Sequence, residues 1–169
     1  CGMAAVLFNH LREKKAAEYF SRMSVASHGP ERDTGHTGNF FNMFWAVPGV
    51  ALSGPNATGA WMQEFGGWYF DLARRWDGTY LHQGPPAAKP DSYGGWDCTG
   101  AYLLAYAQSL RKLHVTGRTS GVVAPLDAAA AERLVADGRG WSPRRGIAAY
   151  ADRGDAEIIA GLKSWSPVV

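Results

Sequence analysis

Polar side chains that could do chemistry lie among aromatic residues between positions 35 and 113 of this 169-residue chain. Four of them stand out: His36, Asn39, His82 and Asp97. A histidine or a carboxylate that faces a pocket can act as a general acid or base. No complete catalytic motif accompanies these residues, and the phosphate-binding-loop and dinucleotide-binding patterns are both absent. The stretch therefore offers candidate groups without fixing a reaction.

His36 and Asn39 lie in a glycine-rich loop that leads into an aromatic segment, where the pair could face a pocket. A lone histidine in a loop is more often a structural or surface group, so both interpretations stay open. Aromatic rings could stack against an apolar ligand or the face of a sugar, although most of the tryptophans are expected in the core. The candidate binding residues are Asn39, Trp61, His82, Tyr93 and Trp96.

Asp97 directly precedes a predicted helix over residues 98–113. Aspartate is a preferred helix cap, because its carboxylate accepts a hydrogen bond from one of the free backbone N–H groups in the first turn. We therefore predict that Asp97 accepts from the N–H of residue 99 or 100. Asparagine caps about as well as aspartate, so a purely structural Asp97 should tolerate replacement by asparagine.

The composition excludes several classes of protein. With 46% hydrophobic and 19% charged residues the chain is globular rather than disordered. The net charge of +2 and the scattered lysines and arginines argue against nucleic acid as a partner. Two cysteines, Cys1 and Cys98, are too few for a disulfide scaffold, and no spacing of ligands predicts a metal site. No apolar run approaches the roughly 18 residues that a membrane-spanning helix needs.

Helical spacing of apolar residues predicts a pair of helices at the start of the chain. The first covers residues 3–11, where apolar side chains recur every three or four positions. Charged residues at 12–15 separate it from the second, which ends near the breaker Gly29-Pro30. Two helices joined by so short a turn are expected to pack antiparallel.

Bulky aromatic residues begin a third predicted helix at Phe40. Pro48-Gly49 falls inside this segment, and proline removes a backbone donor and clashes with the preceding turn. We therefore predict a kink or a break there. Gly54-Pro55 closes the element, and Asn56 is predicted to cap the helix that follows.

The clearest helical signal follows Asn56. An apolar stripe with a 3.6-residue period predicts one helix whose buried face carries Trp61, Phe65, Trp68, Leu72 and Trp76. Gly66-Gly67 interrupts this helix at a cost of about 1 kcal/mol per glycine relative to alanine, which close packing of a neighbouring helix would explain. The patterns predict that the following side chains are largely buried: Phe8, Phe20, Phe44, Trp61, Phe65, Trp68, Leu72 and Leu104.

The chain changes character after residue 113. Residues 114–126 are rich in small polar residues and lack periodicity, which predicts a linker. Beyond it LVADGRGWSP (134–143) aligns with IIAGLKSWSP (158–167) at an offset of 24 residues. Repeated helical units that each bury one face on the next are typical of solenoids. We therefore predict a helical domain over residues 1–113, a linker over 114–126 and a truncated repeat segment over 127–169.

Most of the chain resembles a family of large bacterial proteins known only as a domain of unknown function. The matching segments are GHTGNFFNMFW (35–45), FDLARRWDGTY (70–80) and YGGWDCTGAYLLAYA (93–107), and the closing WSP repeats resemble HEAT units. The helical region of that family looks like the α/α toroid of terpenoid cyclases and protein prenyltransferases. The resemblance implies an all-α fold, with antiparallel helical hairpins forming part of an α/α toroid and short HEAT-like helices after it.

The toroid resemblance suggests a reaction for Asp97. The Asp-Cys-Thr run at 97–99 resembles a motif of oxidosqualene cyclases in which the aspartic acid protonates the substrate. A carboxyl group buried among aromatic rings has a raised pKa and can stay protonated. Aromatic faces such as Trp61 and Trp96 would then shield a carbocation. This chain departs from the motif at Gly100-Ala101, where the cyclases have Ala-Glu, and the departure weakens the transfer.

A zinc site of the prenyltransferase kind is disfavoured. It would take Asp97 and Cys98, with His82 or His114 as a further ligand. Adjacent residues at a helix start diverge by about 100°, and in those enzymes one residue separates the aspartate from the cysteine. We expect no metal and no cofactor.

Three functions are compatible with these patterns. We favour a binding or scaffold module with an aromatic pocket, inside a larger bacterial protein. The second is an enzyme-like toroid in which Asp97 or His36 supplies acid–base chemistry. The third is a carbohydrate-active helical barrel, which needs paired acidic residues across a cleft, and few acidic residues are placed for it.

The expected partners are the rest of a parent polypeptide and an apolar or glycan ligand, with no nucleic acid and no membrane span. The chain starts at Cys1 rather than methionine and stops within the second repeat, so both ends look cut. A fragment of a toroid should leave apolar surface exposed along its first helix and its tail. The compartment is open, and export is one option, since the start of the parent protein is missing from the sequence.

Overall fold

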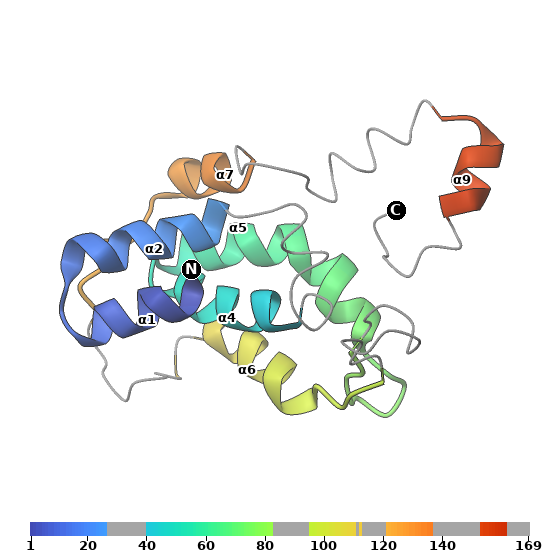
Figure 1. The fold of residues 1–169 in the computed structure, drawn as a ribbon, viewed down its shortest axis with the longest axis horizontal. Coiled ribbons are helices and arrows are strands. Elements are labelled where there is room, and N and C mark those ends of the chain that lie inside the picture. Colours follow the sequence, from blue (N-terminus) through green and yellow to red (C-terminus); the bar gives the residue numbers. More distant parts are fainter. Residues whose placement is uncertain (27–39, 83–94, 111, 113–120, 137–152, 162–169) are drawn as a thin grey trace.

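The computed structural model describes residues 1–26, 40–82, 95–110, 112, 121–136 and 153–161, and this part of the chain contains α-helices and no strand (Figure 1). The prediction of an all-α fold is confirmed for these residues. α1 (Gly2–His10) and α2 (Lys14–Ala26) form the predicted hairpin. Phe8 stacks on Phe20 across it, with ring centroids 5.6 Å apart.

α4 (Phe40–Ala51) is the central helix of the molecule, and it packs against α1, α2, α5 (Pro55–Phe65) and α6 (Thr99–Ser109). A helix that is apolar on all sides must be covered on all sides, and the sequence of α4 is almost wholly apolar. Its buried residues are Met43, Ala46, Val47, Pro48, Gly49 and Val50. The other helices are thus arranged around α4.

The predicted break at Pro48 is not found, because α4 continues through it to Ala51. Neighbouring side chains supply hydrogen bonds near the proline. The Ser21 hydroxyl donates to the carbonyl oxygen of Gly49 at 2.6 Å, and it lies 2.7 Å from the hydroxyl of Ser53. These buried contacts from α2 hold the C-terminal end of α4, which continues past a proline that in an isolated helix would cost about 3 kcal/mol.

α1 and α4 approach each other so closely that their contact accepts only glycine. A Cβ atom built on Gly49 would lie 2.5 Å from the Cα of Gly2, and one built on Gly2 would lie 1.7 Å from the carbonyl oxygen of Trp45. Real Cβ contacts are longer than 3.0 Å. The backbone of one helix therefore fills the place where the other would carry a side chain.

α5 does not use its predicted cap. The N-cap position is Gly54 (φ 93°), and Pro55 occupies the first turn, where its missing N–H is no loss. The amide of Asn56 instead donates to the carbonyl oxygen of Leu126 at 3.0 Å. Asn56 thus fixes the position of a distant segment, and the prediction that it caps α5 was wrong.

The long helix predicted over Trp61 to Trp76 ends at Phe65. A π-helical turn (η1, Gly66–Phe70) and a 3-10 turn (η2, Asp71–Ala73) follow. A π turn adds one residue to the turn, which rotates every later residue by about 100° around the axis. Leu72 is therefore 50% exposed, while Tyr69, Phe70 and Ala73 are buried. Trp76 lies beyond these turns, because the chain becomes extended at Arg74, and it is 93% exposed.

Close helix packing does not explain Gly66-Gly67. A Cβ atom on Gly67 would meet nothing within 4 Å, and one on Gly66 would meet only the end of the Met62 side chain at 3.9 Å. The two glycines instead lie at the start of the π turn, where weak helix propensity favours a departure from regular geometry. The predicted reason for them was wrong, and the correct one is local.

The predicted buried side chains divide into three groups. Trp61 and Phe65 are buried as predicted, whereas Leu72 is exposed. Four others are only partly buried: Phe8, Phe20, Phe44 and Leu104. The side chain of Trp68 lies outside the described residues. The core contains the α4 and α5 residues named above together with Val25, Tyr80, Cys98, Tyr102 and Ala105.

Residues 121–126, hereafter the strap, connect α1, α2 and the turn between α4 and α5. The backbone N–H of Val122 donates to the Asn9 side chain of α1 at 2.8 Å. The N–H of Ala124 donates to Glu18 of α2 at 3.2 Å, and the N–H of Leu126 donates to the carbonyl oxygen of Ser53 at 2.8 Å. This part of the predicted linker is therefore held against the helices.

α7 (Ala128–Ala136) packs on α2 and α5, and its Ala131 and Val135 belong to the same core as α4. α9 (Asp155–Gly161) stands apart from the other helices in Figure 1. The predicted division at residues 113 and 127 remains a prediction, although α7 contributes to the core of the first part. None of the described helices is long and apolar enough to cross a membrane.

The predicted apolar surface along the first helix is present. Met3, Leu7 and Leu11 are exposed and follow one another at intervals of four, so they form a single stripe at α1. On α9 the exposed apolar residue is Ile159. Both surfaces lie outside the core around α4.

Candidate functional site

Two loops meet at the N-terminal end of α6 and are held together by backbone hydrogen bonds. Leu81 forms an isolated antiparallel bridge with Asp97. The N–H of His82 donates to the carbonyl oxygen of Trp96 at 2.8 Å, and the N–H of Cys98 donates to that of Tyr80 at 2.8 Å. This pairing places His82 and Cys98 over the aromatic core.

A polar network lies buried beneath these loops. Nδ1 of His82 is 3.3 Å from the hydroxyl of Tyr102, and that hydroxyl donates to the hydroxyl of Tyr69 at 3.1 Å. We call His82, Tyr69, Tyr102 and Cys98 the buried cluster; all four are buried. Phe40 and Phe70 enclose it, with ring centroids 5.4 Å from His82 and 5.2 Å from Tyr102 respectively.

Burial shifts the proton equilibria of this cluster. Removal from water raises the pKa of the Cys98 thiol from 9.0 to about 11. Hydrogen bonds with Tyr102 and with the backbone of His82 lower this pKa, but by less than burial raises it. Burial also raises the pKa values of Tyr102 and Tyr69. These groups are protonated at neutral pH, so Cys98 lacks the thiolate character of a nucleophile.

The raised pKa values predict that the fold loses stability in alkali. Each group holds its proton more tightly in the folded state, so the unfolded chain releases protons first as the pH rises. We expect the free energy of unfolding to fall from about pH 9, the ordinary pKa of the thiol, and to keep falling as the tyrosines follow. Urea unfolding across this range measures the effect. Cys98→Ser should delay the fall until the tyrosines titrate, whereas an unchanged profile would contradict the burial argument.

The hydrogen bond predicted for Asp97 is present, but the N-cap residue of α6 is Cys98, so Asp97 lies one position before the N-cap. Its carboxylate accepts a hydrogen bond from the backbone N–H of Thr99 at 2.8 Å, although the helix begins at Thr99 rather than Cys98. Asp97 is exposed, and hydrogen bonds from the side chain and backbone of Thr99 lower its pKa. The buried carboxyl with a raised pKa that a proton donor needs is therefore not found at this position.

Replacing Asp97 with alanine is expected to lower the urea midpoint of unfolding, and replacing it with asparagine should change the midpoint little, since asparagine also caps. The lowered pKa means that the stabilisation is present above the ordinary pKa of the carboxyl and disappears as the pH falls below it. Wild type and the alanine variant should thus converge in acid. Equal losses in the alanine and asparagine variants would rule out simple capping.

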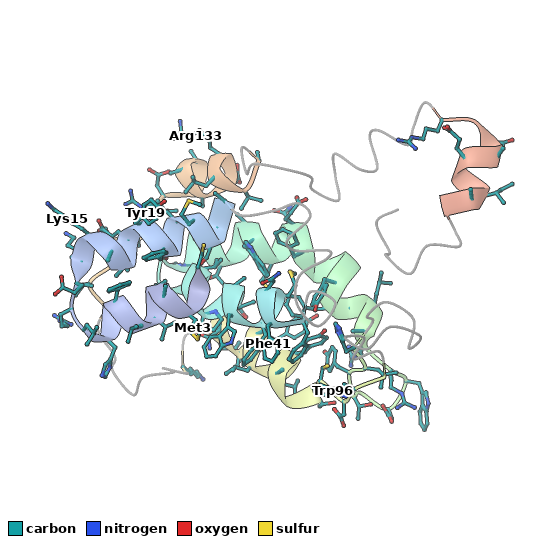
Figure 2. All side chains as sticks on the ribbon, viewed as in Figure 1. Met3, Lys15, Tyr19, Phe41, Trp96 and Arg133 are labelled. Carbon is teal, nitrogen blue, oxygen red and sulfur yellow. The ribbon has the colours of Figure 1, made fainter. Side chains whose placement is uncertain are left out.

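Two tryptophans face solvent on the same pair of loops. Trp76 is 93% exposed beside Asp77, and Trp96 is 50% exposed beside Asp97. Figure 2 shows Trp96 at the N-terminal end of α6. Thr79 donates to Asp77 from its hydroxyl and its N–H, and these bonds lower the pKa of Asp77. We call Trp76, Trp96, Asp77 and Asp97 the tryptophan rim.

The structure brings only part of the predicted site together. His82, Trp96 and Asp97 lie on neighbouring segments, with His82 buried and the other two exposed. Trp61 belongs to the core, where its ring packs 4.5 Å from that of Phe65. His36, Asn39 and Tyr93 lie outside the described residues. No group of potential metal ligands occurs in the residues that the structure describes.

The sequence patterns missed the exposure of Trp76, which they placed in the buried stripe. The signals that could have found it are Gly66-Gly67 inside the helix and the Asp77-Gly78 turn directly after Trp76. They also missed Tyr69, which lies off the predicted stripe and becomes buried through the π turn.

A second concave surface lies between α2 and α7, with a volume of about 340 Å³. Residues from both helices line it, including Lys15, Tyr19, Arg22 and Met23 of α2 and Leu134 of α7. In Figure 2 Lys15 and Tyr19 lie on the upper side, near Arg133 of α7 and away from Trp96. We call this surface the α2–α7 groove.

Comparison with known proteins identifies a family and no activity. Residues 1–117 match a family described as Domain of unknown function (DUF6288), and the match covers more than half of the chain. No curated protein and no solved structure matches the chain.

Proposed function

We propose that this chain, which belongs to the DUF6288 family, is a binding module whose tryptophan rim stacks against a neutral carbohydrate, and whose helices are a scaffold within a larger protein. The helical body would form part of an α/α toroid, with α7 and α9 as HEAT-like units. The observation that carries the proposal is the exposure of Trp76, which is 93% accessible on a loop fixed by hydrogen bonds.

Exposing Trp76 requires a departure from regular helix geometry. The apolar stripe would have buried it, but the regular helix ends at Phe65, and after the π turn over Gly66–Phe70 the chain becomes extended at Arg74, two residues before Trp76. Single π turns inside helices are rare and are frequently found at functional sites. An indole held in water gives up the free energy that burial would provide, and such exposed aromatic residues are typical of recognition surfaces.

The acidic residues of the rim suit hydroxyl donors. Asp77 and Asp97 have lowered pKa values and are ionised at neutral pH. A carboxylate accepts hydrogen bonds and donates none, so it complements the hydroxyl groups of a sugar, whose C–H face packs on indole. Neither residue can serve as the protonated acid of a glycosidase pair, which favours binding over cleavage.

The rim rests on a rigid support. The bridge between Leu81 and Asp97 ties the two loops to each other, and the buried cluster fixes them against α4 and α6. A preformed surface loses little conformational entropy when it binds. This rigidity supports the proposal of a preformed binding site.

Affinity electrophoresis tests the proposal, with soluble β-glucan, galactomannan and xylan as probes in native gels. We expect retardation by at least one probe, and a reduction in affinity of about tenfold in Trp76→Ala or Trp96→Ala, from the energy of one aromatic contact. Leu7→Ala is the matched control, since it removes an exposed apolar side chain from α1, at the far end of the molecule in Figure 1.

Three outcomes separate the alternatives. Retardation that both tryptophan variants lose and Leu7→Ala keeps would support the rim. Retardation unaffected by either variant would place the sugar elsewhere and contradict the proposal. No retardation by any probe, together with binding of a detergent monomer to the rim, would show an apolar ligand instead of a glycan.

A further inference from the structure

The α2–α7 groove has an apolar floor and a cationic edge. Tyr19 and Met23 are exposed along α2 and, with Leu134 of α7, form the apolar part. Lys15 and Arg22 stand seven residues apart, two turns of α2, and so lie on the same side as Tyr19. Glu18 also lines the groove, and its carboxylate accepts a hydrogen bond from the N–H of Ala124, so the two cations outnumber one engaged carboxylate. Such a surface fits a short amphipathic helix that carries acidic residues on its polar side.

α9 has the complementary composition. Asp155 and Glu157 lie in its first turn, and the described residues of α9 include no basic side chain. Ile159 is 58% exposed, so the apolar part of this helix is left uncovered. A free helix of seven residues is unstable in water unless it packs against something else.

The internal repeat indicates which surface of α9 should be covered. At the offset of 24 residues, Ile159 aligns with Val135 of α7. Val135 is 7% exposed, because α7 packs on the body through it. Units of a repeat bury equivalent faces on the preceding neighbour. Ile159 is therefore expected to pack next to α7, where the α2–α7 groove lies.

From these features we infer that α9 docks in the α2–α7 groove, with Ile159 on the apolar floor and Asp155 and Glu157 facing Lys15 and Arg22. In Figure 1 α9 stands apart from the helices that line the groove. The 16 residues 137–152 can span up to about 50 Å, enough to reach a groove of which α7 is one wall. Because α9 and the groove belong to one chain, their association is intramolecular, which favours α9 over a separate partner.

A disulfide trap tests this inference on the full chain. In a Cys1→Ser background, the pair Met23→Cys and Ile159→Cys is compared with the control pair Met3→Cys and Ile159→Cys, because Met3 is also exposed but lies on α1. We expect an intramolecular disulfide for the first pair and none for the control. Disulfide-linked dimers would show that a second copy fills the groove, and equal cross-linking of both pairs would show random collision. Either result would overturn the inference.

Hydrogen exchange provides a second measurement, without introduced cysteines. Protection of residues 155–161 is expected to fall on the order of tenfold in Lys15→Glu/Arg22→Glu, and to return when Asp155→Lys/Glu157→Lys is added. Lys15 and Arg22 are exposed, so the variants should fold. The pairing would be refuted if the protection of residues 155–161 did not change in the first double variant. It would also be refuted if the second pair of substitutions did not restore that protection. The tryptophan rim plays no part in either test, so its success or failure is independent.

Discussion

Replacing Phe70 with alanine is expected to lower the free energy of unfolding by about 3–5 kcal/mol, the range for a fully buried phenylalanine. Phe70 is completely buried, and its ring lies 5.2 Å from that of Tyr102 and 6.2 Å from that of Trp61. Its removal would leave a cavity between α5 and α6 that these rigid rings cannot fill. Urea unfolding with two-state analysis measures the loss.

The matched control is Trp76→Ala, which should change the free energy of unfolding by less than about 0.5 kcal/mol because Trp76 is exposed. Together the two variants locate the π turn in solution. An uninterrupted helix from Trp61 onward would reverse the result, with a large loss for Trp76 and a small one for Phe70. That reversal would show that the helix keeps its regular register beyond Phe65.

Gly49→Ala is expected to cost about 1–3 kcal/mol, as overpacking of a tight contact does. The new Cβ would lie 2.5 Å from the Cα of Gly2 and 2.8 Å from the hydroxyl oxygen of Ser24. The Cα of Gly2 is a backbone atom and cannot relieve the clash by changing rotamer, as a side chain could. The whole of α1 must therefore move away from α4. Thermal or urea unfolding would show the loss directly.

Gly59→Ala separates this contact from the general effect of placing alanine in a helix. Gly59 lies in α5, and its Cβ would meet nothing within 4 Å. Alanine there should stabilise the fold by about 1 kcal/mol through helix propensity alone. Stabilisation by both substitutions would show that the α1–α4 contact is looser than the structure indicates.

Local patterns predicted those parts of the fold that depend on neighbours in sequence. The α1–α2 hairpin, the apolar helix from Phe40 and the hydrogen bond from the N–H of Thr99 to Asp97 all follow from spacing and residue type. Periodicity failed after Phe65, since it assumes a constant 3.6 residues per turn and a π turn breaks that assumption. The same error placed Trp76 in the core and left Tyr69 out of it.

The candidate site depends on contacts that no local pattern contains. Tyr69 and Tyr102 are 33 positions apart, and their hydrogen bond forms only after η1 and α6 have packed. His82 was proposed from its residue type, but its burial follows from the pairing of two loops through Trp96. Asp97 is exposed, and this argues against a buried general acid at that position. Exposure depends on how the whole chain packs, so no local pattern could have predicted it.

The strap has a consequence for the order in which the chain folds. Val122 bonds to Asn9 across 113 positions, and Ala124 bonds to Glu18 across 106. Contacts of such long range close large loops and slow folding relative to helical proteins built from local contacts. During synthesis α1 and α2 leave the ribosome long before their partner in the strap exists. The N-terminal hairpin therefore reaches its final hydrogen bonding only once residue 124 has been made.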